Sequence, residues 1–287
     1  MKPHGIMRKR GGITYISFSH FEENGGVLAA FTTRLGGFSA TPYDTLNVGL
    51  FCGDKPYHVQ ENRRKIESAL AVSLRDRVLI VHGNQILVAE RELRNDELPE
   101  GDAILTCLPG YSLSMTFADC VPVYLYDPDW KAIALVHAGW RGTLAGISAL
   151  AVERMICEYG SAPGRILAAI GPSIGPCCFM VDAEVASRFS EKFPYGQDLI
   201  HGMANISSKE QDEGDGTSPS RNCTYIDLWD ANRRQLVESG IHDENIAVSG
   251  FCTSCRKDLF FSYRRDGRTS GRMAAIMSIN KKVDKDA

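Results

Sequence analysis

Residues 111–140 read YSLSMTFADCVPVYLYDPDWKAIALVHAGW, and this stretch decides the fold class. It contains three successive apolar runs, at 111–120, 121–127 and 131–140. Each run is too short for a typical helix, is rich in branched or aromatic residues and is bounded by Gly, Pro or Asp, which together favour strands. Because the apolarity is nearly continuous, we expect strands that are covered on both faces.

Apolar runs of the same kind lie on both sides of this stretch. They read GVLAAFTT (26–33), RVLIVHG (77–83), ILAAIGP (166–172) and RMAAIMSI (272–279). Apolar residues at helical spacing between them predict four helices, at 58–72, at 144–160, after a cap at Asp182 and from a cap at Asp227 to Gly240. Strands and helices interspersed in this way predict an α+β fold with helices packed over sheet.

The composition is that of a globular protein. Of 287 residues, 44% are hydrophobic and 23% charged, and 32 basic against 35 acidic residues give a formal net charge of -3. This balance gives no electrostatic case for binding nucleic acid or a membrane surface. No run approaches the ~20 apolar residues of a membrane span, and the basic N-terminus lacks the apolar run of a signal peptide. We therefore expect a cytoplasmic protein.

We expect a single domain over residues 1–287. Its one unusual segment is NISSKEQDEGDGTSPSRN at 205–222, which has almost no large apolar residues. Such a segment cannot offset the entropy lost when it becomes ordered. We predict that it is an exposed, mobile insertion within the domain, because the apolar runs before and after it are alike.

Three of the strand-like runs end near a residue that can bind a transition metal: His82, Cys120 and His137. Two imidazoles and one thiolate match a zinc site with an open fourth position, at which a bound water would be acidified. Ordinary core histidines and a buried thiol explain the same spacing equally well. A third interpretation makes Cys120 a nucleophile, with His137 as its base and Asp119 as the group that orients the base.

Arginines and glycines form a second candidate site, for an anion. The string TTRLGG at 32–37 continues to Asn47, and Arg141 closely follows His137. Arginine suits bidentate recognition of phosphate, and glycines let backbone amides approach an anion. We favour Arg34 and Arg141, because each lies beside small residues at the end of an apolar run, over the arginines of the segment FFSYRRDG at 260–267.

The nine cysteines are an odd number in a chain large enough to need no staples, which favours free thiols or metal ligands over disulfides. Cys252 and Cys255 form a single CxxC with no second pair at the spacing of a zinc ribbon, so we do not expect a structural zinc site there. Cys177 and Cys178 lie in a turn-rich passage that tight packing explains. The chain has neither GxGxxG nor a P-loop, which argues against Rossmann cofactors and NTPase chemistry.

Nine strings together resemble one family. They are TTRLGG, TLNVGL, VHGNQI, GDAILT, MTFADCVPVYLYD, ALVHAGWRGT, AAIGPSIGPCC, YIDLWDANRRQL and CTSC...LFFSYRRDG, in order from about Phe31 to Ile279. The family is the bacterial one long called multicopper polyphenol oxidase or laccase-domain proteins. Its members are now regarded as purine nucleoside phosphorylases with adenosine deaminase activity.

The resemblance implies that His82, Cys120 and His137 bind zinc, and that the fold is a four-layer α/β/β/α sandwich with a central pair of mixed sheets. It implies phosphorolysis of adenosine, inosine and methylthioadenosine and deamination of adenosine, with an older claim of copper-dependent oxidation. A role in removing wrongly built peptidoglycan precursors has also been proposed for bacterial members of the family. The chain departs from the family pattern at four places, Ile80, Gly101–Ala103, Met180 and Ser270, and these leave the substrate contacts open.

Our leading hypothesis is zinc-supported chemistry on a purine nucleoside. In it, Arg34, Asn47 and Arg141 bind substrate or phosphate, and Asp119 transfers a proton or supports a histidine. The alternative is a metal-independent Cys-His amidohydrolase that acts on a peptidoglycan precursor through Cys120. A copper polyphenol oxidase is less favoured, because a multicopper relay needs many histidines and the chain has seven.

Overall fold

The computed structural model describes residues 4–24, 26–74, 78–91, 98–202 and 223–279. The insertion predicted at 205–222 lies outside these residues. Among the helices described, none combines the length and the apolarity that a membrane crossing requires.

The described strands form three sheets, and the largest has six strands in the order β13-β9-β7-β8-β5-β4. Its strands are β4 (Ile86–Val88), β5 (Ala103–Thr106), β7 (Val121–Asp127), β8 (Ala132–Ala138), β9 (Leu167–Ile170) and β13 (Ile246–Val248). The β4–β5 and β13–β9 pairs are parallel, and the other three pairs are antiparallel. This sheet is mixed, as expected.

The second sheet has five strands in the order β1-β2-β3-β14-β6. Its strands are β1 (Gly5–Arg10), β2 (Ile13–Phe18), β3 (Val27–Thr32), β6 (Ser112–Phe117) and β14 (Met273–Ile279). All four pairs are antiparallel, so the expectation of two mixed sheets is wrong for this one. The third sheet, β10 (Met180–Val181), β12 (Thr224–Ile226) and β11 (Ile200–Gly202), was not predicted, because its strands are too short to give a periodic pattern.

The described helices include the four that the sequence predicts, and three short ones that it does not. The predicted helices are α2 (Pro56–Leu70), α4 (Ile147–Tyr159), α5 (Ala183–Lys192) and α6 (Leu228–Glu238), and the short ones are α1 (Ser19–Asn24), α3 (Trp140–Leu144) and α7 (Tyr263–Asp266). Both predicted caps are confirmed: the Asp182 carboxylate accepts from Val185 N, and the Asp227 carboxylate accepts from Trp229 N and Asp230 N. The left-handed Gly160 ends α4, as glycine does most readily.

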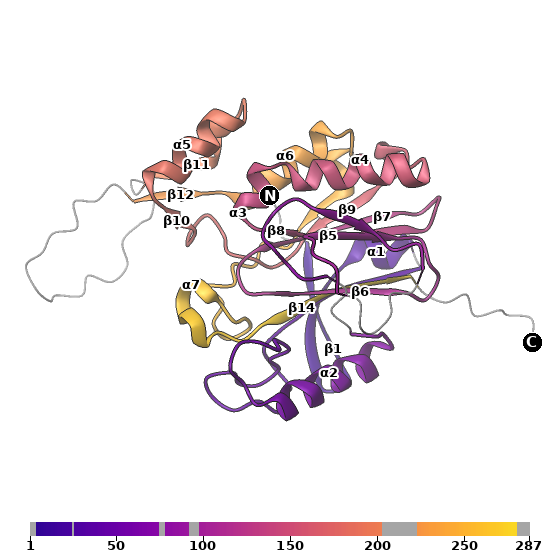
Figure 1. The fold of residues 1–287 in the computed structure, drawn as a ribbon, viewed down its shortest axis with the longest axis vertical. Helices are drawn as coiled ribbons and strands as arrows, with labels where there is room; N and C mark the ends of the chain where they lie inside the picture. The colour runs from indigo at the N-terminus through magenta and orange to yellow at the C-terminus, as the bar shows by residue number, and fades with distance from the viewer. Residues whose placement is uncertain (1–3, 25, 75–77, 92–97, 203–222, 280–287) are drawn as a thin grey trace, which may run out of the picture.

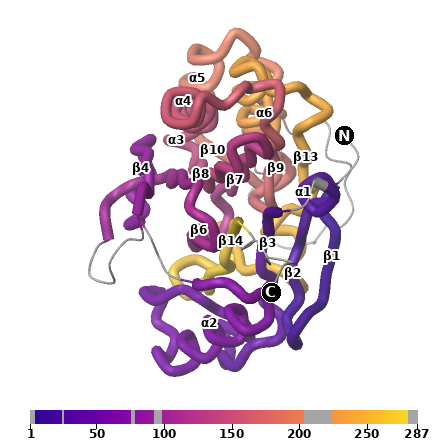
Figure 2. The backbone as a smooth tube through the Cα atoms, turned by 90° about the vertical axis from the view of Figure 1, so that its right-hand side faces the viewer, coloured from indigo at the N-terminus to yellow at the C-terminus, as the bar shows by residue number. Residues whose placement is uncertain are grey.

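Successive side chains of the central strands point into two different hydrophobic cores. In β5, Ala103 and Leu105 face a core shared with α4 and α6, whereas Ile104 faces the core between the two large sheets. A third core, with Ile66 of α2, lies on the other face of the five-stranded sheet. The α+β class is therefore confirmed, and helices cover the outer faces of two sheets that pack against each other (Figures 1 and 2). Strands β7 and β8 are buried along their whole length, as their continuous apolarity predicts.

Candidate functional site

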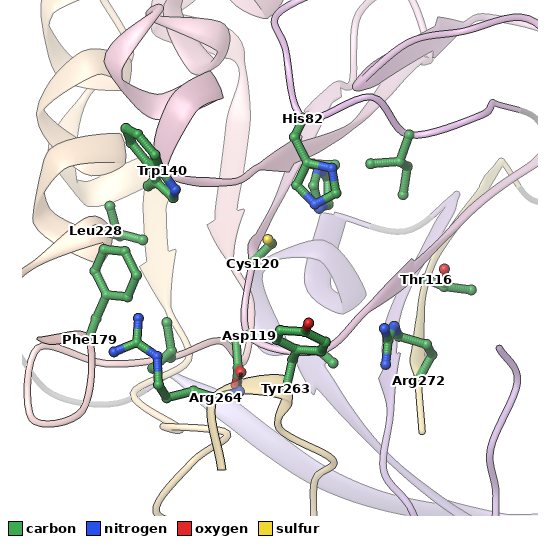
Figure 3. A pocket seen from close by; sticks show the side chains of 14 residues that line it. His82, Thr116, Asp119, Cys120, Trp140, Phe179, Leu228, Tyr263, Arg264 and Arg272 are labelled. Atoms are coloured by element: carbon green, nitrogen blue, oxygen red, sulfur yellow. Dashed lines mark hydrogen bonds between the residues drawn. The ribbon is translucent and has the colours of Figure 1, made fainter. Parts of the chain in front are cut away.

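The structure brings the three predicted metal ligands together. One ligand atom from each of His82, Cys120 and His137 lies within 4.8 Å of the other two. The two imidazole rings are perpendicular, with their centroids 4.9 Å apart. Figure 3 shows the His82 ring and the Cys120 sulfur facing the same space.

The hairpin of β7 and β8 places two of these ligands. Pro122 pairs with His137 in the ladder, so Cys120, two residues before Pro122, lies beside the end of β8. Gly139 faces the three side chains: a Cβ added there would lie 3.4 Å from Cys120 Sγ and 3.6 Å from His82 Cδ2. A larger side chain at this position would fill the space between the ligands, and glycine keeps it open.

His82 reaches the site from a loop, and the strand predicted at 77–83 is wrong. The described part of that run forms only an isolated bridge between Leu79 and Glu100. Leu79 and Val81 are 44% and 42% exposed, so the run is not covered on both faces. His82 has a φ of 58°, a left-handed conformation that a strand cannot contain.

Asp102 holds this loop and connects two of the ligands. Its fully buried carboxylate accepts from His82 N at 2.8 Å and from Gly83 N at 2.7 Å, and it bonds His137 Nδ1 at 3.1 Å. A carboxylate only accepts, so Nδ1 carries the proton and Nε2 of His137 is left for Cys120 or a metal. Support of a histidine, which the sequence suggested for Asp119, is the role that Asp102 has here.

The charges of the site favour a thiolate next to an imidazolium. Burial by itself would raise the pKa of Cys120, but the charge and hydrogen bond of His137, with the hydrogen bond of His82, lower it to about 6. Burial would likewise lower the pKa of His137, but Cys120 and Asp102 raise it to about 9. Asp102 is also desolvated, yet its hydrogen bonds to His137, Gly83 and His82 and the His137 charge hold its pKa below the usual value.

Asp119 precedes Cys120 and connects it to the C-terminal segment. Its largely buried carboxylate accepts from Thr253 Oγ1 at 2.6 Å, from Ser262 Oγ at 3.0 Å and from Arg264 N at 2.7 Å. Three donors occupy most of its acceptor positions, so the visible role of Asp119 is to position the turn before β7. A direct role in proton transfer stays a prediction.

The three ligands line a cavity of about 530 Å³. Figure 3 shows Tyr263 between Arg264 and Arg272 along one side, opposite His82 and Cys120. The remaining labelled walls are largely apolar, formed by Trp140, Phe179 and Leu228. The cavity thus combines a candidate metal site, flat aromatic surfaces and two cations.

The two arginines of the cavity differ from those that the sequence favoured. Within the described part of the chain, neither Arg264 nor Arg272 forms an ion pair with a carboxylate. Arg264 donates to the backbone carbonyl of Met180 at 2.6 Å, and Arg272 donates to the carbonyls of Ser270 and Gly271. Each guanidinium has five donors, so several remain for a ligand. The segment at 260–272 was visible in the sequence, but nothing local distinguished its arginines from others.

The predicted anion ligands lie elsewhere. Arg34 is outside the cavity lining, forms an ion pair with Asp44 at 3.2 Å and lies over the Phe261 ring. Arg141 also lies outside the lining, with its guanidinium over the ring of Trp140. Asn47 is fully buried, and its side-chain oxygen accepts from Arg272 N at 2.8 Å. Asn47 therefore fixes the backbone of a cavity arginine without lining the cavity.

A second group of possible metal ligands is formed by Cys177, Cys178, Cys252 and Cys255. Their sulfur atoms also lie within 4.8 Å of one another. From the sequence we expected no site here, because Cys252 and Cys255 have no second pair at the spacing of a zinc ribbon. That reasoning is wrong: the second pair is Cys177 and Cys178, which are adjacent in sequence and so do not match the spacing of a zinc ribbon.

Comparison with known proteins agrees with this fold and site. The model of the family described as multi-copper polyphenol oxidoreductase laccase matches residues 28–280. The chain therefore belongs to that family.

Curated members of the family are named purine nucleoside phosphorylases. YlmD of Geobacillus stearothermophilus is 38% identical over 261 residues, which are 88% of this chain and 90% of that protein. YfiH of Escherichia coli is 35% identical and covers 88% of this chain and 93% of its own length. The crystal structure of the Geobacillus YlmD superposes with a TM-score of 0.79 over 98% of this chain and 100% of that one, at 34% identity.

The lowered pKa of Cys120 predicts how its thiol reacts in metal-free protein. A thiolate with a pKa of about 6 stays reactive down to about pH 6 and loses reactivity below it, as protons return to the sulfur. We expect the rate of iodoacetamide alkylation at Cys120, followed by peptide mass spectrometry after chelation, to be half-maximal near pH 6. The His137→Ala variant should move that midpoint upward by more than one pH unit. A wild-type midpoint above pH 8 would contradict the thiolate–imidazolium pair.

Proposed function

We propose that this chain is a zinc-dependent purine nucleoside phosphorylase that acts on adenosine, inosine and methylthioadenosine and that also deaminates adenosine. The observation that carries the proposal is the cavity, which joins two imidazoles and a thiolate on one side to two arginines on the other. The names of the relatives support the phosphorylase activity. The proposed substrates are accordingly purine nucleosides and phosphate.

The donor set suits zinc. Two imidazole nitrogens and one thiolate occur in catalytic zinc sites, which keep a fourth position for water or substrate. Ligand atoms around one tetrahedral zinc lie roughly 3.3–3.8 Å apart, and those of His82, Cys120 and His137 already lie within 4.8 Å of one another. A bound zinc would supply a Lewis acid and a water acidified toward neutrality. Copper is less favoured, because the chain has only seven histidines.

The cavity arginines are the proposed phosphate ligands. Arg264 and Arg272 line the cavity without a carboxylate partner among the described residues, whereas Arg34 is paired with Asp44. Guanidinium groups bind phosphate oxygens through paired, charge-assisted hydrogen bonds. In phosphorolysis the phosphate attacks the anomeric carbon of the ribose as the base departs, so these residues position the nucleophile for attack.

The aromatic walls are the proposed purine site. Trp140 and Phe179 present flat apolar surfaces to the cavity, on which a purine can stack. A purine held there has its edge toward His82, Cys120 and His137. For deamination, a purine bound in this way would have its amino-bearing carbon near the candidate metal ligands. We retain Asp119 as a candidate for proton transfer, since it lines the cavity next to Cys120.

The alternative is a metal-independent Cys-His amidohydrolase that acts on a peptidoglycan precursor. One observation favours it: the pKa of Cys120 is lowered to about 6, and Asp102 bonds the far nitrogen of His137. Cys120, His137 and Asp102 would then form a nucleophile, base and orienting acid. The two proposals differ in whether activity requires the metal.

The metal requirement is tested on protein purified without added metal. We expect phosphate-dependent release of hypoxanthine from inosine, with kcat/KM reduced roughly 10²-fold or more by His82→Ala and by Cys120→Ala, the scale on which one preorganised electrostatic group acts. Cys107→Ala, at an exposed cysteine outside the cavity, is the matched control for Cys120→Ala and should keep full activity. Hydrolysis of a peptidoglycan precursor by zinc-free enzyme that is abolished by alkylation of Cys120, without phosphate-dependent cleavage of inosine, would support the amidohydrolase and contradict the phosphorylase proposal.

The arginine assignment predicts a selective effect on phosphate. Charge-assisted hydrogen bonds contribute about 1.5–3 kcal/mol, and about 1.4 kcal/mol is tenfold in affinity. We expect Arg264→Ala and Arg272→Ala each to raise the KM for phosphate about tenfold or more. Arg141→Ala, which removes a cation outside the cavity lining, should change it less than twofold. Equal effects of all three substitutions would mean that the cavity arginines do not bind phosphate, and thermal unfolding checks that each variant is folded.

Asp102→Asn tests the support of the metal ligands. Groups that hold a histidine ligand typically affect metal affinity about 10–100-fold. The amide keeps an acceptor for the backbone of the loop but cannot stabilise a charged or strongly polarised His137. We expect the affinity of the His82–Cys120–His137 site for zinc, measured by competition with a chromophoric chelator, to fall by about 10–100-fold. Unchanged affinity would show that Asp102 serves only the backbone of the loop.

A further inference from the structure

Four cysteines form a cluster that the proposed phosphorylase reaction does not use. Cys177 and Cys178 lie in the turn after β9, and Cys252 and Cys255 lie in the turns after β13. The Cys255 sulfur is 3.5 Å from that of Cys177 and 3.4 Å from that of Cys178. Cys252 is buried at the base of the cluster, and Cys177 and Cys255 are exposed.

We propose that these four cysteines bind a structural zinc ion. Around a tetrahedral zinc with four thiolates, sulfur atoms lie roughly 3.7–3.8 Å apart, close to the separations seen here. A disulfide would require about 2.05 Å, would use only two of the sulfurs and would leave the other two unexplained. Binding forms four zinc–sulfur bonds, and the four thiols release their protons to solvent.

The fold holds the two cysteine segments together independently of any metal. Ser173 N donates to Phe251 O at 3.2 Å, and Thr253 N donates to Ser173 O at 3.0 Å. Gly175 N donates to Cys252 Sγ at 3.3 Å, a bond that favours a thiolate at that position. A backbone amide directed at a ligand sulfur is the kind of surrounding support that metal sites require. The cluster is therefore a built feature of two segments far apart in sequence.

Positive charge lies next to the cluster. A zinc ion with four thiolates carries a net charge of −2, which needs compensation near a partly buried site. Arg265 donates to the carbonyls of Thr253 and Ser254, the two residues between Cys252 and Cys255. Arg256 follows Cys255 directly. Each arginine is also paired with an aspartate, Arg265 with Asp266 at 2.7 Å and Arg256 with Asp258 at 2.8 Å, so the two compensate only part of that charge.

The zinc ion would fix two walls of the proposed nucleoside cavity. Phe179, which lines the cavity, follows Cys178, and Thr253, which donates to Asp119, follows Cys252. Arg264 links the segment after Cys178 to Asp119, because its side chain donates to Met180 O and lies over the Phe179 ring while its backbone N donates to the Asp119 carboxylate. The ion is thus a positioning element that holds an aromatic wall at a set distance from Cys120.

Zinc content of the full-length protein, measured by elemental analysis, tests the inference. We expect Cys255→Ser and Cys178→Ser each to lose one zinc per chain relative to wild type, and the exposed control Cys157→Ser to lose none. His82→Ala should leave this zinc in place, so the two sites are counted separately. Zinc that is lost only with His82→Ala would overturn the present inference and leave the phosphorylase proposal standing. Zinc that is lost only with the cysteine variants would support the present inference and contradict zinc binding at the His82–Cys120–His137 site.

A measurement on wild-type protein covers variants that fail to fold. Cys177 and Cys255 are exposed, so free thiols at these positions should be alkylated at the same rate before and after treatment with a chelator. Zinc ligation predicts that they are protected until the ion is removed by a strong chelator, as followed by peptide mass spectrometry. Equal alkylation rates of Cys177 and Cys255 before and after chelation, a disulfide among the four cysteines in freshly purified protein, or bound iron in place of zinc would each overturn the proposal.

Discussion

The hydrogen bonds of one buried carboxylate, that of Asp102, are the constraint on which the candidate site depends. A buried charge without partners is costly, and removing one partner of such a group typically destabilises a protein by about 3–5 kcal/mol. Asp102 meets this requirement with two backbone amides and His137 Nδ1. The same hydrogen bonds hold the loop at 82–83 beside the end of β8. The Asp102 carboxylate therefore also brings His82 and His137 together.

Asp102 also explains where the prediction of the fold failed. Strands β7, β8, β9 and β14 were predicted because short, nearly continuous apolar runs rich in branched or aromatic residues are typical of buried strands. The caps of α5 and α6 are also local signals that the sequence contains. The run at 77–83 has the same local pattern but forms no strand. Its conformation is set by a carboxylate 20 residues away at His82 N, a contact that periodicity does not encode. The direction of strand pairing is likewise nonlocal, and the expectation that the five-stranded sheet is mixed came from the family resemblance alone.

The sequence likewise indicated some residues of the candidate site and missed others. The metal ligands were recognisable, because His82, Cys120 and His137 occur in motifs that a family shares, although spacing alone left a core role equally plausible. The sequence favoured Arg34 and Arg141 because a guanidinium beside small residues at the end of an apolar run looks available to an anion. In the structure Arg34 is neutralised by Asp44, while Arg272 is aimed into the cavity by the bond from its backbone to Asn47. Whether an arginine can bind a ligand depends on its ion-pair partner, and that partner is known only from the folded structure.

Asp119 shows how the two cysteine-bearing regions become one unit. It lies between strand β6 and Cys120. Its carboxylate accepts hydrogen bonds from Thr253 Oγ1 and Arg264 N, which belong to the C-terminal part of the chain. A shift of the segment that carries Cys252 would therefore move Thr253, and through Asp119 the turn that sets the Cys120 sulfur. The proposed structural zinc and the proposed catalytic zinc are then mechanically connected although they share no ligand. This connection explains why the buried carboxylate of Asp119, next to Cys120, accepts hydrogen bonds only from the C-terminal part of the chain among the described residues. Its role is then to keep the aromatic wall of the cavity at a fixed position relative to the candidate metal ligands.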